Sequence, residues 1–260
     1  MGLDFTAMKD FLEAMTDRYN RPGFIENDPI SIPHRFSKKE DIEIAGFLSA
    51  TIAWGQRTSI IKNAMKLIEW MDHDPYRFIL GFESADLKPF NNFVHRTFNG
   101  SDCIAFLNSL RQIYSMHGGP ESLITPDATA PTIKESICRF RKVFFESPHE
   151  SRTQKHLADP AKNASAKRLN MFLRWMVRDD GRGVDFGLWK KISPQQLMCP
   201  LDVHSGGVAR KLGLLQRKQN DWKAVEELTA TLQKFDPEDP VKFDFALFGL
   251  GINEGFANRA

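Results

Sequence analysis

The feature that most constrains the fold of this chain is the helical spacing of its apolar residues. Hydrophobic side chains recur three and four positions apart along most of the sequence, as they do in residues 4–19 at Phe5, Met8, Phe11, Leu12 and Met15. We find neither a pair of alternating segments nor an Asn-Gly turn between such segments, which are the patterns typical of β-hairpins. The sequence therefore predicts an all-α protein with about ten or more helices.

Glycine and proline residues divide this pattern into separate helices. Gly55 ends one helical pattern, and Pro148 and Pro160 interrupt a polar loop at 147–164. The expected helices cover residues 4–19, 37–54, 58–71, 101–116, 132–146, 165–178, 203–212, 221–235 and 240–250. With 260 residues, the chain is long enough for one large domain or two closely packed lobes.

The charge and the cysteine content exclude several classes of protein. The net charge is only +2, so any nucleic-acid contact has to come from a local basic patch. Cys103, Cys138 and Cys199 are far apart and form no C-x-x-C motif, which argues against a metal cluster or a disulfide framework. No apolar run approaches the length of a membrane span, and no secretion signal begins the chain. We therefore expect a cytoplasmic protein with no membrane partner, no metal and no cofactor.

A basic amphipathic helix is expected at 165–178, and Lys167 lies in its first turn. Ser165 is the expected N-cap, and the polar positions form one basic face made of Lys167, Asn170, Arg174 and Arg178. A lysine at this end of a helix opposes the helix dipole, and Arg168 adds a second positive charge beside it. Both effects favour the neutral amine that a nucleophile needs. The alternative is a solvated basic face with ordinary lysines.

Asp202 is the second residue of interest. It follows Pro200 and precedes the helix expected at 203–212, so we expect it to cap that helix. Capping alone is one interpretation, and His204 beside it is then a structural residue. Gly206 and the glycine after it lower helix stability, which suggests a close approach by another backbone or by a phosphate, although packing explains the two glycines as readily. An amine and a carboxylate at two helix starts, in a slightly basic protein, suggest Schiff-base chemistry on a nucleic acid.

The motif around Asp202 resembles that of a known superfamily. Pro-Leu-Asp-Val-His at 200–204, followed by Gly-Val-Ala-Arg-Lys-Leu-Gly-Leu at 207–214, is similar to the motif of the helix-hairpin-helix DNA glycosylases (HhH-GPD). Residues 224–251 resemble the helices that follow the motif, and 48–57 resemble the opening helix. The resemblance covers about 40–75 and 160–251, and the chain also resembles an uncharacterised bacterial family common in Bacteroidetes. It implies one glycosylase-like domain over 1–260, with two packed helical lobes at about 38–146 and at 1–37 plus 160–260.

The resemblance also implies roles for single residues. By position, Asp202 would be the catalytic carboxylate and Lys167 the Schiff-base lysine of members that also nick the strand. The Gly-x-Gly hairpin that precedes this lysine in the superfamily is replaced by Asn-Ala-Ser-Ala at 163–166, and the spacing from lysine to aspartate is longer than usual. The archaeal 8-oxoguanine glycosylases (AGOG) share both traits and are the most similar branch. The cysteines that bind an iron–sulfur cluster in other branches are missing.

The implied activity is excision of a damaged base from duplex DNA, followed by abasic-site lyase cleavage, with no obligate protein partner. The target nucleotide has to leave the base stack to reach the site. We expect DNA contacts from Gln56, Arg57, Arg174, His204, Arg210 and Lys211. A base pocket is expected from Trp54, Trp175 and Phe248, although aromatic residues at helical spacing also pack in cores.

Two other functions fit parts of the sequence. One is a catalytically silent helical protein that binds DNA or RNA. The other is a metal phosphohydrolase that uses Asp72, His73 and Asp74 together with scattered histidines. Bound metal in the purified protein would favour this last alternative.

Overall fold

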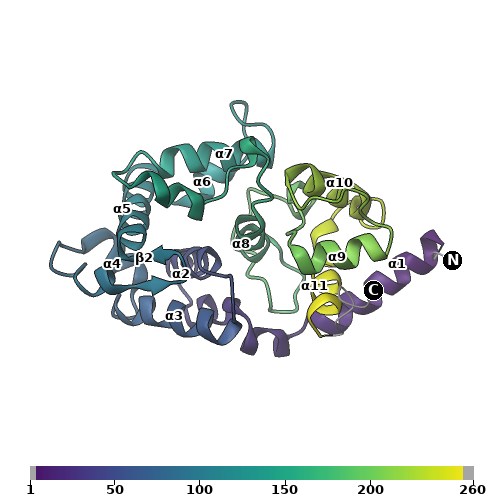
Figure 1. Cartoon of the computed structure of the whole chain (residues 1–260), viewed down its shortest axis with the longest axis horizontal. Coiled ribbons are helices and arrows are strands. Elements are labelled where there is room, and N and C mark those ends of the chain that lie inside the picture. Colours follow the sequence, from purple (N-terminus) through teal and green to yellow (C-terminus); the bar gives the residue numbers. More distant parts are fainter. Residues whose placement is uncertain (1–3, 254–260) are drawn as a thin grey trace. The chain divides into compact units, whose positions relative to one another are not determined.

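A computed structural model describes residues 4–253 of the chain, and this part is mostly helical (Figure 1). The α-helices are α1 (Phe5–Tyr19), α2 (Lys39–Thr51), α3 (Arg57–Glu69), α4 (Pro75–Gly81), α5 (Gly100–His117), α6 (Pro120–Ile124), α7 (Ile133–Phe144), α8 (Lys167–Val177), α9 (Val203–Lys211), α10 (Trp222–Gln233) and α11 (Asp244–Asn253). Two short strands, β1 (Val94–His95) and β2 (Phe98–Asn99), form an antiparallel hairpin with Val94 opposite Asn99.

The helical prediction is confirmed, but three short elements differ from it. α4 and α6 were not expected, because each is too short to show a helical period and begins at a proline. The hairpin was also missed, since strands of two residues show no alternation. No helix within residues 4–253 has the length and apolar character needed to cross a bilayer.

The chain divides into two compact units. Of the described residues, 4–24 and 159–253 form the terminal unit and 25–158 form the central unit. Residues 25–37, which we expected with the terminal lobe, belong to the central unit. The reason is burial: Ile30 and Ile32 are fully buried, and the short 3₁₀ helices at Pro29–Ser31 and Pro33–Arg35 pack on α2.

Aromatic side chains fill the core of the central unit. The Phe47 ring, on α2, packs against the rings of Phe106, Phe140 and Phe144, with centroids 5.5–6.0 Å apart. Phe98 of the hairpin joins this cluster through an edge contact with Phe106. Because all five rings are almost fully buried, they account for a large part of the apolar surface that this unit removes from water.

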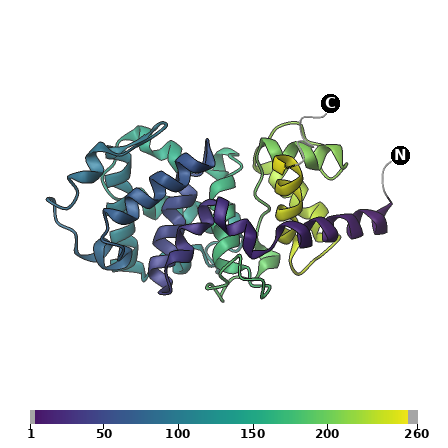
Figure 2. The ribbon, with the colours of Figure 1, turned by 90° about the horizontal axis from the view of Figure 1, so that it is seen from below.

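The core of the terminal unit lies around α11. This helix packs against α9 and α1 (Figures 1 and 2), and apolar residues of α1, α9, α10 and α11 form one buried cluster. Two glycines of α11 permit the close packing. A Cβ at Gly249 would lie 2.2 Å from the Tyr19 ring, and one at Gly251 would lie 3.1 Å from His204 Cβ. The start of α9 is therefore fixed against α11, beside the residues described next.

Candidate active site at the starts of two helices

Lys167 is the first residue of α8, as the sequence indicated, but the cap differs from our expectation. The N-cap is Ala166, which has left-handed backbone angles (φ 50°, ψ 33°) and no capping side chain. Ser165 was the wrong choice because the chain turns sharply at Ala166, and the Ser165 carbonyl instead accepts a hydrogen bond from the Asn170 amide at 3.1 Å. The left-handed turn directs the chain into α8 at Lys167 without a glycine.

Asp202 is the N-cap of α9, as predicted, and its two oxygens have separate partners. Oδ1 accepts hydrogen bonds from the backbone N–H groups of His204 (2.8 Å) and Ser205 (3.0 Å). The Ser205 hydroxyl accepts the Asp202 N–H at 3.0 Å, which completes a capping box. Oδ2 lies 3.4 Å from Lys167 Nζ. Capping and pairing with the amine are thus compatible functions of one carboxylate.

The pair is accessible to a ligand while partly shielded from water. The side chains of Lys167 and Asp202 are 21% and 24% exposed to solvent. Burial alone would raise the pKa of Asp202, but the Lys167 ammonium and the N–H groups of Ser205 and His204 hold this pKa below its ordinary value. Asp202 is therefore ionised at neutral pH, and it faces the amine directly.

Phe248 of α11 forms one wall of this site. Lys167 Nζ lies 5.5 Å from the centroid of the Phe248 ring, which is only partly buried. Phe24 contacts the same ring edge-on at 6.3 Å and holds it in place. Of the three aromatic residues that we expected in a base pocket, the structure places Phe248 beside the amine.

Sequence reasoning missed a second carboxylate near the pair. Asp244, the first residue of α11, is buried and forms an ion pair with Arg174. Burial raises the pKa of Asp244 to about 6, although the positive charges of Arg174 and Lys167 act against this rise. The available signal was an acidic residue between Phe243 and Phe245, because a charge within an apolar segment needs a partner.

Arg174 corrects our expectation of an exposed basic face on α8. It is only 3% exposed, and its guanidinium contacts Asp185 as well as Asp244. Asn170 and Arg178, which share this face, are buried too. The face is polar because it lies against acidic side chains inside the unit, so Arg174 is not a phosphate contact.

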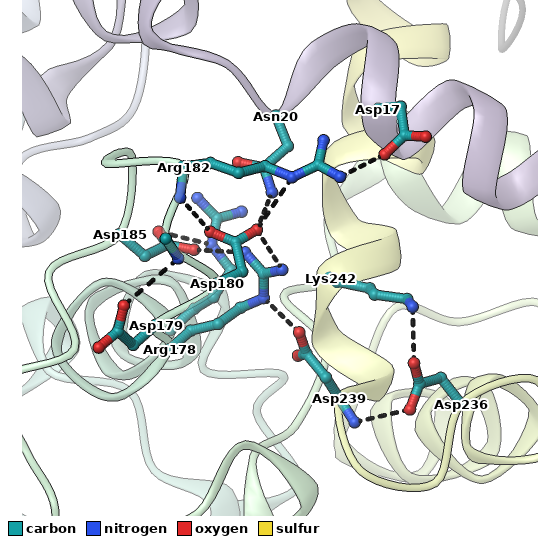
Figure 3. Close-up of polar contacts among 12 residues, drawn as sticks. Asp17, Asn20, Arg178, Asp179, Asp180, Arg182, Asp185, Asp236, Asp239 and Lys242 are labelled. Atoms are coloured by element: carbon teal, nitrogen blue, oxygen red, sulfur yellow. Dashed lines mark hydrogen bonds and ion pairs between the residues drawn. The ribbon is translucent and has the colours of Figure 1, made fainter.

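Arg178 is the centre of this internal network (Figure 3). Its guanidinium pairs with Asp180 at 2.9 Å, Asp185 at 3.1 Å and Asp239 at 2.8 Å. Asn20, just after α1, donates to Asp180 at 2.5 Å. The network connects the end of α8, the loop after it and the segment before α11. It therefore fixes the positions of the helices that carry Lys167 and Phe248.

Other expected contacts in the terminal unit have different outcomes. Trp175 is fully buried in the core and is not free to stack on a base, so this expectation was wrong. Arg210 is half-buried and donates to the carbonyl of Arg217 at 2.8 Å and to the side chain of Asn220 at 2.7 Å, so it orders the loop after α9. His204 is half-buried against α11, whereas Lys211 is exposed at the end of α9.

The glycine at 206 also has a structural explanation. A Cβ at Gly206 would lie 2.7 Å from Asn220 Oδ1 and 2.9 Å from Arg210 Nη1. The space is therefore taken by side chains of the same unit, so that packing explains this glycine, rather than another backbone or a phosphate.

Three expected contacts belong to the central unit. Gln56 is the exposed N-cap of α3, and Arg57 is its half-buried first residue. Trp54, also half-buried, packs on the rings of His95 at 5.1 Å and His156 at 5.9 Å. Gln56 and Arg57 thus lie at a surface tip between α2 and α3, as the sequence predicted.

The metal alternative finds no supporting geometry in residues 4–253. Asp72 and His73 are exposed, and both have positive φ angles, 52° and 55°, in the turn after α3. No group of three His, Cys, Asp or Glu side chains in this part of the chain is arranged to hold a metal ion.

Comparison with known proteins gives one match. The model of a family described as protein of unknown function (DUF2400) matches residues 28–253. No curated protein and no solved structure matches the chain. The matched range includes both members of the Lys167–Asp202 pair.

Proposed function

The chain belongs to the DUF2400 family, whose description states no function, and we propose from its own residues that it is a DNA glycosylase with abasic-site lyase activity. The observation that carries the proposal is the Lys167–Asp202 pair, with Nζ 3.4 Å from Oδ2 and both side chains partly exposed. An amine beside an ionised carboxylate is the arrangement that nucleophilic attack on a sugar carbon needs. The resemblance to the glycosylase motif agrees with this chemistry.

In the proposed reaction, Asp202 accepts a proton from the Lys167 ammonium and leaves a neutral amine. The amine attacks C1′ of the flipped nucleotide, and a new N–C1′ bond forms as the glycosidic bond breaks. The departing base keeps the bonding electron pair and takes up the proton that Asp202 had accepted. Asp202 is thereby ionised again and stabilises the positive charge that remains on the sugar bound to Lys167. Ring opening then gives a Schiff base, and loss of the C2′ proton expels the 3′ phosphate and nicks the strand.

Residues of each unit have proposed roles in binding DNA. Phe248 supplies an apolar ring next to the amine, on which a displaced base can stack. Lys211 is an exposed cation at the end of α9 and a candidate phosphate contact. In the central unit, Gln56 and Arg57 are candidates for the gap left by the flipped base, with Trp54 beside them.

Borohydride trapping tests the proposal directly. The protein is incubated with duplex oligonucleotides that carry 8-oxoguanine, uracil or an abasic site, reduced, and analysed for a covalent complex. We expect a trapped complex that Lys167→Gln abolishes. Asp202→Asn should keep the helix cap, because asparagine is a good N-cap, but slow the trapping by about 100-fold or more. Lys162→Gln, which removes an exposed lysine of the same unit, serves as the control.

The substrate pattern distinguishes the alternatives. A complex on a base-lesion duplex would establish glycosylase activity and identify the base. A complex on the abasic site alone would restrict the activity to the lyase step. Binding to DNA without a complex on any substrate would refute the Schiff-base mechanism and favour the silent binding protein.

A further inference from the structure

The β1–β2 hairpin of the central unit carries an arginine that our sequence reasoning did not consider. Arg96 follows β1 in the two-residue turn of the hairpin and has a left-handed φ of 54°. A left-handed backbone is unfavourable for a residue with a side chain such as arginine. The surrounding structure therefore has to hold the turn in this conformation.

Contacts on both sides fix the hairpin. His95 bonds through Nε2 to the Trp54 carbonyl at 3.0 Å and through Nδ1 to Asn63 at 2.8 Å. On the other side, Arg152 donates to the Thr97 carbonyl at 2.7 Å. Since these contacts bracket Arg96, the base of its side chain is held in a defined position.

The Arg96 side chain lies over the tip between α2 and α3. A Cβ built on Gly55 would lie 3.3 Å from Arg96 Cδ, 3.4 Å from Nε and 3.5 Å from Cζ. Gly55 also has a φ of 105°, which only glycine adopts readily. The guanidinium is thus packed against the backbone that immediately precedes Gln56 and Arg57.

No carboxylate among the described residues pairs with Arg96. Among residues 4–253 it has no ion pair, and its side chain is exposed. Arg152, on the neighbouring segment, is paired with Asp102, but that carboxylate is fully buried beneath it. The surface around the tip therefore presents arginine side chains and the exposed amide of Gln56. The negative charge of Asp102 lies below this surface.

We propose that this hairpin is a DNA-binding element in which Arg96 binds a backbone phosphate next to the tip formed by Gly55, Gln56 and Arg57. The choice of DNA rests on the proposed function. A planar guanidinium with free donors binds phosphate in a bidentate manner. Because the Arg96 guanidinium already packs on Gly55, little side-chain entropy is lost when the phosphate binds.

Binding of a fluorescein-labelled duplex with a tetrahydrofuran abasic-site analogue tests the inference. All variants carry Lys167→Gln, so that no reaction interferes. Arg96→Asn removes the charge and keeps a residue that tolerates the left-handed conformation. We expect its Kd to rise by about tenfold and the slope of log Kd against log salt to fall by about 1, the contribution of one phosphate contact. Arg96→Lys should retain most of the slope, and Arg77→Gln, at an exposed arginine of α4, should change neither quantity.

The outcomes separate this inference from the proposed function. Unchanged affinity and slope in Arg96→Asn would refute the phosphate contact and leave the glycosylase proposal intact. A weaker affinity with an equally lowered thermal stability would assign Arg96 a structural role and also refute the inference. Binding that depends on Arg96, without trapping by the protein that retains Lys167, would refute the glycosylase and uphold the contact. Absence of binding to any duplex would refute both.

Discussion

Asp244 gives the structure a measurable pH dependence. The carboxyl group is buried, and the charged or titratable groups around it are Arg174, Lys167, Asp202 and Asp185, together with the buried thiol of Cys199. Because burial raises its pKa, the folded protein binds a proton at Asp244 more tightly than the unfolded chain does. The stability from this proton is fully present below the unfolded pKa and is lost as the pH rises through the folded pKa.

The size of the effect follows from the two pKa values. A rise from 3.8 in the unfolded chain to about 6 in the folded protein corresponds to about 3 kcal/mol, at about 1.4 kcal/mol for each pH unit. An asparagine side chain has the shape of the protonated acid and does not titrate. In Asp244→Asn the contribution is therefore absent at every pH. The attraction between Arg174 and the ionised Asp244 is already contained in the pKa of about 6, because the positive charge of Arg174 opposes the rise.

Urea unfolding of both proteins from about pH 4 to about pH 7 measures this difference. Across this range, which begins just above the unfolded pKa, we expect Asp244→Asn to become more stable relative to the parent protein by about 2 kcal/mol. Glu238→Gln, which removes an exposed carboxyl of the same unit, is the matched control. A flat difference for Asp244→Asn would mean that Asp244 does not take up a proton on folding, and our account of the site's charges would be wrong.

Two further predictions concern stability. Arg178→Met should lower the free energy of unfolding by about 3–5 kcal/mol at neutral pH, because Asp180, Asp185 and Asp239 lose their shared cation. In urea titrations this loss should become smaller in acid, where the carboxylates are protonated. An equal loss at every pH would contradict the explanation. Ala166→Gly should stabilise the protein by about 0.5–1 kcal/mol, because glycine adopts the left-handed backbone of this position without strain. As the control, Ala209→Gly within α9 should destabilise the protein by about 1 kcal/mol. If thermal unfolding shows a loss of stability at both positions, Ala166 is not strained.

Helical spacing was sufficient to predict the long helices and the positions of Lys167 and Asp202 at two helix starts. Local rules explain this success. Asp202 follows a proline and precedes a helical pattern, and such a carboxylate caps the helix whatever lies around it. The first turn of α8 was also readable, because the apolar positions of that helix define where it begins. Neither prediction required knowledge of distant contacts.

The surroundings of the pair depended on distant contacts and were not predictable in the same way. Arg174 looks like a solvated base in the sequence, yet its partners Asp185 and Asp244 come from a loop and from another helix. A basic stripe on a helix has the same spacing whether it faces water or buried carboxylates. Trp175 was uncertain for a related reason, because an aromatic residue beside that stripe can face the core or a ligand.

The capping and catalytic interpretations of Asp202 looked like alternatives in the sequence, but the geometry makes them compatible. Oδ1 is held by the N–H groups of α9, so the carboxylate cannot rotate freely, and Oδ2 remains directed at Lys167. The same N–H groups lower the pKa of Asp202 and keep it charged. A cap thus orients and ionises the group that faces the amine, which is the preorganisation that stabilising a positive charge on a sugar requires.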